Sequence, residues 1–232
     1  MIRAVGPTLG GFGLTGVLVD PVLELFRNDG STLAVNDSWG SDGNAAAITA
    51  TSARVGAFAL PSGSTEAVIS VALPPGNYTA QVRGAAGGTG IGLVEVYDAG
   101  TGTENSRLSG ISSRAEVGVG GNILIAGFVV RGTEPKTILI RGVGPGLNAF
   151  VTGAVANPKL ELYRSATLIN ENDDWTDPAI ATAAARSGTF AIAAGSRDAA
   201  LLVTLQPGSY TAQVSGVAAS TGVALIEVYE AP

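Results

Sequence analysis

The amino-acid sequence predicts an all-β protein made of two tandem β-sandwich repeats of jelly-roll type, of which the first lacks its opening strands. Three observations support this fold class: several phrases occur twice in the same order, short segments alternate apolar and polar residues, and Pro-Gly or Asp-Gly turns separate those segments. The composition agrees, since 46% of the residues are hydrophobic and only 14% are charged. The abundance of Gly, Ala, Val, Thr and Ser favours short strands and tight turns.

An internal repeat organises the chain. The phrase LPPGNYTAQVRG at residues 73–84 returns as LQPGSYTAQVSG at residues 205–216. Other pairs follow the same order: IRAVGPTL at 2–9 with IRGVGPGL at 140–147, DPVLELFR at 20–27 with NPKLELYR at 157–164, NDSW at 36–39 with NDDW at 172–175, GAFALPSGSTEA at 56–67 with GTFAIAAGSRDA at 188–199, and TGIGLVEVYD at 89–98 with TGVALIEVYE at 221–230. Matches of this length indicate one shared fold. We therefore predict a first repeat over residues 1–104 and a second over residues 105–232.

The two repeats begin differently. Residues 106–139 precede Ile140 in the second repeat, and nothing equivalent precedes Ile2 in the first. The second repeat is therefore complete and the first starts partway through the sandwich. We expect either that Met1 is a truncated or reassigned start, or that another strand completes the first repeat. The alternative is that residues 106–137 bridge both repeats, or complete the first repeat or another chain.

Alternation with a period of two residues marks the strands. VLELF at 22–26 places large apolar side chains on one face and Glu24 on the other. The same alternation occurs in KLELY at 159–163, YTAQV at 78–82 and 210–214, and LVEVY at 93–97. The runs ILIAGFVV at 123–130 and TILIRGV at 137–143 are continuously apolar, which predicts strands covered on both faces.

The repeated twelve-residue phrase combines a turn with a strand. Proline presets φ and glycine allows positive φ, so its Pro-Gly pair predicts a tight turn before the strand. Tyr78 and Tyr210 follow that turn, and we expect each to anchor the core beside it.

Two alanine-rich segments, residues 43–56 and 177–188, predict one or two turns of helix each. Asp177 stands directly before Pro178. This pair predicts an N-cap followed by proline in the first helical turn.

Charge and composition exclude several classes of function. The formal net charge is −6 and the chain has no basic patch, so nucleic acid is not an expected partner. No apolar run approaches the length of a membrane span, so membrane insertion is not expected. The chain contains no cysteine and no histidine, which excludes disulfides and thiolate catalysis and removes the commonest general base.

Several phrases resemble a known kind of module. SRLSGISSRAEVGVGGNILIAGFVVRG, KTILIRGVGPGL and LQPGSYTAQVSG resemble a tandem β-sandwich repeat near the C-termini of large secreted or cell-surface proteins of environmental bacteria. The half from LELY to EVYE is also similar to bacterial pre-peptidase C-terminal domains, which share its strand, Asn/Asp-rich loop and Gly-x-Tyr-Thr hairpin. The resemblance implies a non-catalytic module at the cell surface or outside the cell, as a mature segment of a larger precursor. It supplies no catalytic residues.

Two acidic loops are candidate calcium sites, because clustered carboxylate and amide oxygens suit a hard cation. The candidate ligands are Asn36, Asp37 and Asp42 in the first loop, and Asn172, Asp173, Asp174 and Asp177 in the second. The alternative is that these residues only form turns and hydrogen-bond to their own backbone. Calcium is the single cofactor that the sequence suggests.

Trp39 and Trp175 are the only tryptophans and occupy equivalent positions beside those loops. An exposed indole ring beside a polar loop could stack on a sugar, which makes both residues candidate ligand-binding groups. The alternative is that each ring closes one end of its sandwich.

Four glutamates lie in the middle of predicted strands: Glu24, Glu95, Glu161 and Glu227. A pair of carboxylates about 5–10 Å apart could hydrolyse a glycoside. The alternative, which the alternation favours, is a solvent-facing row paired across strands with arginines. The expected partners are Arg3, Arg27, Arg141 and Arg164.

These observations favour a non-catalytic extracellular structural or adhesive module. A sandwich without its opening strands exposes sheet edges, through which the chain could associate with itself as a homo-oligomer or fibre. A second interpretation is a carbohydrate-binding accessory module of a secreted enzyme, with polysaccharide as the partner. A third is a carboxylate-dependent glycoside hydrolase.

Overall fold

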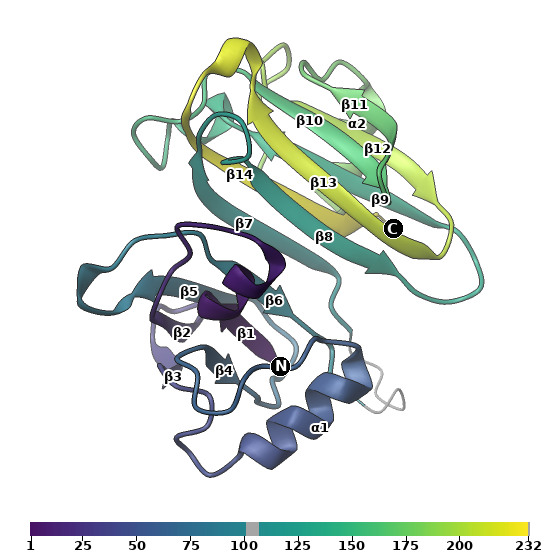
Figure 1. Cartoon of the computed structure of the whole chain (residues 1–232). Helices are drawn as coiled ribbons and strands as arrows, with labels where there is room; N and C mark the ends of the chain where they lie inside the picture. Colours follow the sequence, from purple (N-terminus) through teal and green to yellow (C-terminus); the bar gives the residue numbers. More distant parts are fainter. Residues whose placement is uncertain (101–106, 232) are drawn as a thin grey trace. The chain divides into compact units, whose positions relative to one another are not determined.

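The computed structural model describes residues 1–100 and 107–231. The chain divides into two compact units, Met1–Arg107 and Leu108–Pro232 (Figure 1). The boundary predicted between residues 104 and 105 lies outside the described residues. Both units are built mainly of antiparallel strands, so the predicted all-β class is confirmed. No helix in the described ranges is both long and apolar enough to cross a membrane.

The second unit is a complete two-sheet sandwich with the strand orders β11-β10-β13-β8 and β12-β9-β14-β7. Its strands are β7 (Gly110–Val117), β8 (Leu124–Val130), β9 (Lys136–Val143), β10 (Pro158–Arg164), β11 (Thr167–Asn172), β12 (Ala199–Leu205), β13 (Gly208–Gly216) and β14 (Gly222–Glu230). Two short 3₁₀ helices, η3 (Pro145–Leu147) and η4 (Val217–Ala219), lie between strands. The inward faces of both sheets form one core that includes Ile140, Leu160, Val214 and Ile226. The segment before Ile140 completes this unit, because β7 pairs with β14 and β8 pairs with β13.

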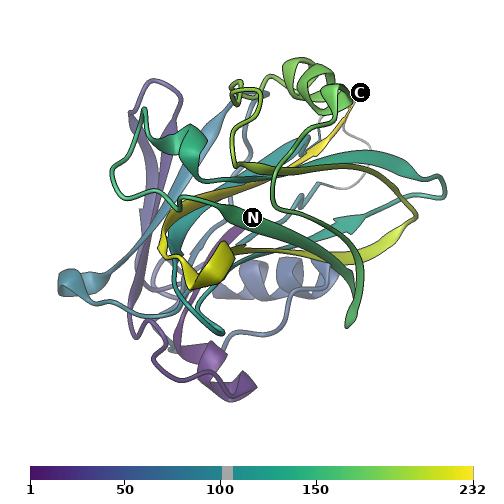
Figure 2. The ribbon, with the colours of Figure 1, turned by 90° about the horizontal axis from the view of Figure 1, so that it is seen from above.

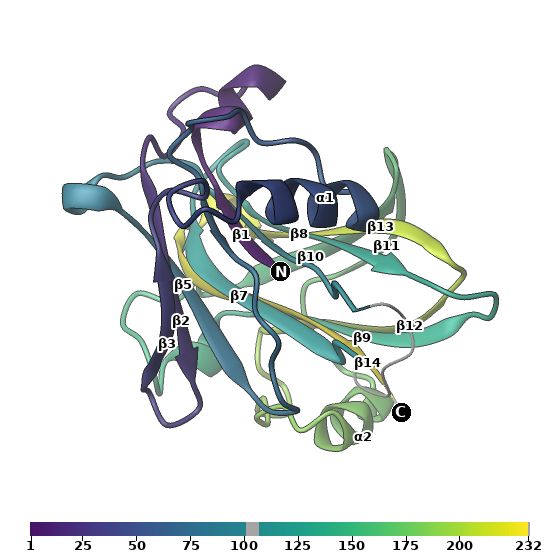
Figure 3. The same cartoon turned by 90° about the horizontal axis from the view of Figure 1, so that it is seen from below.

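A helix covers the outer face of one of these sheets. Figures 2 and 3 show α2 (Pro178–Arg186) outside the sheet that contains β9, with the C-terminus beside it. Ile180 and Ala184 of α2 pack with Leu139 of β9 and with Trp175, and Ala231 joins the same cluster. The second unit therefore has a main core between its sheets and a smaller apolar cluster beneath α2.

This helix explains why two apolar strands differ in burial. β9 is buried on both faces, as predicted, because the main core lies on one side and the α2 cluster on the other. In β8, however, Ile125 and Val129 are exposed. The prediction that residues 123–130 are covered on both faces is therefore wrong, since α2 packs on the other sheet.

Both predicted helices are present. The Asp177 carboxylate accepts a hydrogen bond from Ala179 N at 2.8 Å, so the predicted N-cap of α2 is confirmed. α1 (Ala45–Val55) contains 11 residues, which is about three turns at 3.6 residues per turn. The expectation of one or two turns was too short for α1, because no helix-breaking residue intervenes before Gly56.

The first unit has the same pairing order with fewer strands. Its sheets have the orders β4-β1-β6 and β3-β2-β5. Its elements are β1 (Ile2–Val5), η1 (Pro7–Phe12), β2 (Pro21–Arg27), β3 (Thr32–Asn36), α1, β4 (Ala67–Ile69), β5 (Tyr78–Gly84), η2 (Ala85–Gly87) and β6 (Leu93–Val96). β1 lies between β4 and β6 as β9 lies between β12 and β14, and β2 lies between β3 and β5 as β10 lies between β11 and β13. Within residues 1–100, no strand corresponds to β7 or β8, as predicted.

The repeated phrase forms a hairpin end and the strand that follows it, β5 in one unit and β13 in the other. Tyr78 Oη donates a hydrogen bond to Pro74 O at 3.0 Å, and Tyr210 Oη donates one to Gln206 O at 2.8 Å. Tyr210 also lies in the core of its unit and Tyr78 packs partly buried against the core of the other, so the predicted anchor is confirmed.

Candidate functional site

The acidic loop of the first unit is held by hydrogen bonds to Asn36. Its Oδ1 accepts from Val68 N at 2.9 Å, and its Nδ2 donates to Ser38 O at 3.4 Å and to Asp42 Oδ2 at 3.3 Å. Asp37 is exposed. The side-chain amide of Asn36 therefore joins the loop to β4, because its oxygen bonds to β4 and its nitrogen bonds to the loop.

The acidic loop of the second unit repeats this arrangement. Asn172 Oδ1 accepts from Ala200 N at 2.9 Å, and its Nδ2 donates to Asp174 O at 3.1 Å. Asp173 and the Asp174 side chain are exposed, and Asp177 caps α2. Within residues 1–100 and 107–231, no three acidic side chains gather closely enough to hold a metal ion. The observed contacts fit the turn interpretation of both loops.

Trp39 and Trp175 lie beneath the helices, and each is only 6% exposed. Trp39 packs with Ile48 of α1, and Trp175 packs with Ile180 of α2. The indole nitrogens donate to hydroxyl groups, Trp39 Nε1 to Ser64 Oγ and Trp175 Nε1 to Ser196 Oγ, both at 3.2 Å. A ring must expose one face to stack on a sugar, so this burial favours the packing interpretation of both tryptophans.

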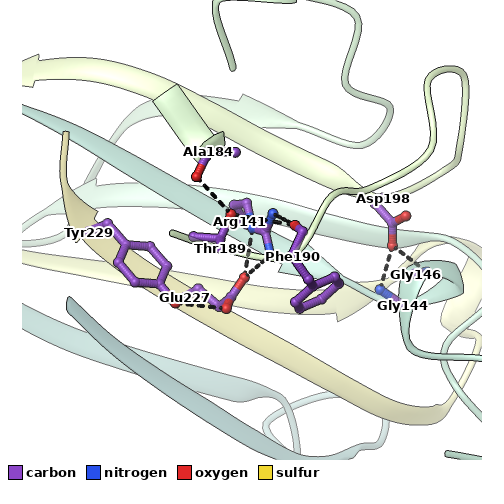
Figure 4. A network of polar contacts seen from close by, with 9 residues as sticks. All are labelled: Arg141, Gly144, Gly146, Ala184, Thr189, Phe190, Asp198, Glu227 and Tyr229. Carbon is purple, nitrogen blue, oxygen red and sulfur yellow. Dashed lines mark hydrogen bonds and ion pairs between the residues drawn. The ribbon is translucent and has the colours of Figure 1, made fainter. Parts of the chain in front are cut away.

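The mid-strand glutamate of β14 belongs to a buried network (Figure 4). Arg141 is fully buried, and its Nε donates to Glu227 Oε2 at 2.6 Å. Tyr229 Oη donates to the other carboxylate oxygen of Glu227 at 2.9 Å. The predicted Arg141 pair is confirmed, but its expected solvent exposure is wrong, because the segment around Phe190 covers this face of the sheet.

The first unit contains the same network. Arg3 Nε lies 3.0 Å from Glu95 Oε2, and Tyr97 Oη donates to Glu95 Oε1 at 2.6 Å. Burial, and then the neighbouring carboxylate of Glu95, raise the pKa of Tyr97 to about 12. Each carboxylate is thus held by a buried arginine and a tyrosine hydroxyl, which is a structural role.

The other two glutamates form ion pairs with residues other than those predicted. Glu24 pairs with Arg83 on β5 at 2.8 Å rather than with Arg27. Glu161 pairs with Lys159, two residues away on the same face of β10, at 3.0 Å rather than with Arg164. Each of these four glutamates thus pairs with an arginine or a lysine.

Sequence reasoning missed one buried carboxylate in each unit. Asp198 Oδ1 accepts from Gly144 N at 2.8 Å and from Gly146 N at 3.1 Å, as Figure 4 shows. Glu66, the equivalent residue, accepts from Thr8 N at 2.7 Å. The sequence does contain a signal for these carboxylates, because Glu66 and Asp198 occupy equivalent positions of the two repeats. The glycine-rich VGP segments therefore bind a carboxylate of their own chain.

The remaining candidate site is the pair of sheet edges formed by β5 and β6. Each is the last strand of its sheet among the described residues of the first unit. Val94 of β6 is 40% exposed, whereas Ile226, at the equivalent position of β14, is 1% exposed. Tyr78 of β5 is half-buried, whereas Tyr210 of β13 is buried. We call these two edges, with the inward-facing side chains beside them, the open edges.

Comparison with known proteins finds similarity among solved structures. No protein-family model matches this chain, and no curated protein matches it. Among solved structures, the chain is similar to the pre-peptidase C-terminal domain of a collagenase from Bacillus anthracis, with 12% sequence identity and a TM-score of 0.32. The similarity covers 53% of this chain and 99% of that domain. The sandwich fold rests on the strand pairing described above.

Proposed function

We propose that this chain is a non-catalytic extracellular structural or adhesive module that associates through the open edges of its first unit. One observation supports this proposal above all. The two units share a pairing order, yet no strand within residues 1–100 or 107–231 pairs with the edges of β5 and β6, which are equivalent to the edges that β7 and β8 cover in the second unit.

An uncovered edge is a site for strand addition. Edge strands present backbone N–H and C=O groups that pair readily with a further strand. The seven residues of β5 and the four of β6 provide two such edges in one unit. Exposed Leu93 and Val94 add apolar surface beside the β6 edge, and an incoming strand would remove this surface from water.

The test compares two substitutions in the full-length chain. Val94→Lys places a charge beside the β6 edge, whereas Val35→Lys changes an exposed valine of β3, at the far edge of the sheet that contains β5. Sedimentation velocity over a range of concentrations should show association of the unsubstituted chain and of Val35→Lys. Val94→Lys should remain monomeric.

Two results would overturn the proposal. The first is an unsubstituted chain that stays monomeric at every concentration. The second is association that Val94→Lys leaves unchanged, because the contact would then lie elsewhere on the chain. Circular dichroism of both variants establishes that each is folded.

A further inference from the structure

The second unit shows which strands pair at the positions equivalent to the open edges. There, β7 adds to the edge of β14 and β8 adds to the edge of β13. The two strands are consecutive in the chain, so a single two-stranded segment adds the last strand to both sheets. The open edges of the first unit are the same two positions, one on each sheet.

The surface that faces β8 is the same in both units. In the second unit, Tyr210, Ala212 and Val214 of β13 lie opposite Phe128, Ala126 and Leu124 of β8. The rings of Phe128 and Tyr210 stack with their centroids 5.6 Å apart. In the first unit, β5 carries the identical residues in the identical frame, Tyr78, Ala80 and Val82, and all three are only half-buried.

The residues that face β7 in the second unit have similar apolar counterparts in the first unit. Ile226 and Val228 of β14 lie opposite Ser113 and Ile111 of β7. β6 has Val94 and Val96 at the positions of Ile226 and Val228. The inward face of the first unit is therefore already suited to the strand pair that the second unit contains.

From these identities we infer that the open edges bind a two-stranded segment of another polypeptide with the pattern of β7 and β8. Its first strand pairs with β6 and carries small or aliphatic residues on the inward face. Its second strand pairs with β5 and carries alternate apolar residues, with an aromatic ring opposite Tyr78. This inference rests on the proposed function, because it names the chemistry of the partner at the same edges.

The register of the second unit gives the expected register of binding. Leu225 of β14 lies opposite Arg114 of β7, and Leu93 of β6 is the equivalent of Leu225. A strand bound to β6 as β7 is bound to β14 would therefore place its Arg114 equivalent opposite Leu93. Since the chain contains no cysteine, a cysteine pair introduced at these positions reports this register alone.

The probe is a synthetic peptide with the sequence of residues 108–131, which holds β7, β8 and their connection. The peptide carries Arg114→Cys and is mixed with the full-length chain carrying Leu93→Cys under a mild oxidant. We expect a one-to-one disulfide-linked product, identified by mass spectrometry. The matched control is the peptide with Ala115→Cys, whose side chain points to the opposite face of the strand and should give at least tenfold less product.

A second peptide tests the apolar contact. With Phe128→Asp added to the Arg114→Cys peptide, the yield of product should fall at least tenfold, because the ring that stacks on Tyr78 is lost. Equal yields from the Arg114→Cys and Ala115→Cys peptides, or no dependence on Phe128, would overturn the inference.

The outcomes separate this inference from the proposed function. If the unsubstituted chain associates but the peptide is not captured, the partner is another edge of a second copy, and the inference fails while the proposed function stands. If the peptide is captured in register but the chain alone stays monomeric, the inference stands and self-association fails.

Discussion

Arg141 contacts Phe190 in two ways: its Nη1 donates to the carbonyl oxygen of Phe190 at 2.6 Å, and its guanidinium carbon lies 4.6 Å from the centroid of the Phe190 ring. Arg3 contacts Phe58 in the same two ways, at 2.8 Å and 4.5 Å. Each buried guanidinium thus contacts a carboxylate, a carbonyl oxygen and an aromatic face.

Glu227→Gln should destabilise the second unit strongly, because it leaves the Arg141 charge buried without a carboxylate. Removal of one partner of a buried pair lowers the free energy of unfolding by about 3–5 kcal/mol. Urea unfolding measures this change through Trp175 fluorescence in a Trp39→Phe background, where Trp175 is the only tryptophan. The control is Glu161→Gln, whose partly exposed pair with Lys159 should contribute under about 1 kcal/mol. Equal midpoints for the two variants would contradict the structure.

The first unit should lose stability at alkaline pH through Tyr97. Burial and Glu95 raise the pKa of this tyrosine from 10.0 to about 12, so the unfolded chain loses the proton first as the pH rises. The contribution to the free energy of unfolding is therefore complete below pH 10 and is lost as the pH rises toward about 12. Urea unfolding at several pH values, with Trp39 as reporter in a Trp175→Phe background, tests this. Tyr97→Phe should reduce the slope over that range, and an unchanged slope would contradict the assignment.

Gly216→Ala should destabilise the second unit, because the new Cβ would lie 1.9 Å from the carbonyl oxygen of Ser220. Relief of such a clash costs about 1–3 kcal/mol or more. Gly121→Ala is the matched control, since its Cβ would meet nothing within 4 Å. Thermal unfolding should show a lower midpoint for Gly216→Ala only. A normal midpoint for this variant would mean that the backbone of Ser220 does not lie as close to Gly216 as in the structure.

Asn36→Ala separates the turn interpretation of the first acidic loop from the calcium interpretation. The substitution leaves the buried Val68 N–H without its partner, so the free energy of unfolding should fall by about 1–3 kcal/mol with or without calcium. Asp37→Ala should change stability little, because Asp37 is exposed. Thermal unfolding in calcium and in a chelator measures both variants. A stabilisation by calcium that Asp37→Ala abolishes would instead support an ion site.

Local pattern was sufficient to predict much of the fold. The alternation at residues 22–26 and 78–82 identified β2 and β5, and Asp177 before Pro178 identified the start of α2, because these signals depend on neighbouring residues. The missing counterparts of β7 and β8 followed from comparing the two repeats. This comparison also located the open edges.

Contacts between distant segments could not be predicted in this way. Alternation indicates that Glu227 points away from the face of Ile226, but it does not indicate what covers the other face. That cover comes from Phe190, which is 37 residues from Glu227 along the chain. The burial of Trp175 has the same origin, since α2 packs over it. The exposure of Ile125 and Val129 was also unpredictable, because an apolar run does not reveal which sheet the helix covers.

The difference between the two units has a geometric consequence. The open edges and the strand pair that they bind are different surfaces. A contact between them therefore does not use the same surface on both partners, as a contact across a two-fold axis does. Such head-to-tail contacts build closed rings when the rotation between neighbours completes a circle, and open chains when it does not. Growth through the first unit would accordingly have a direction, with acceptor and donor ends that are chemically distinct.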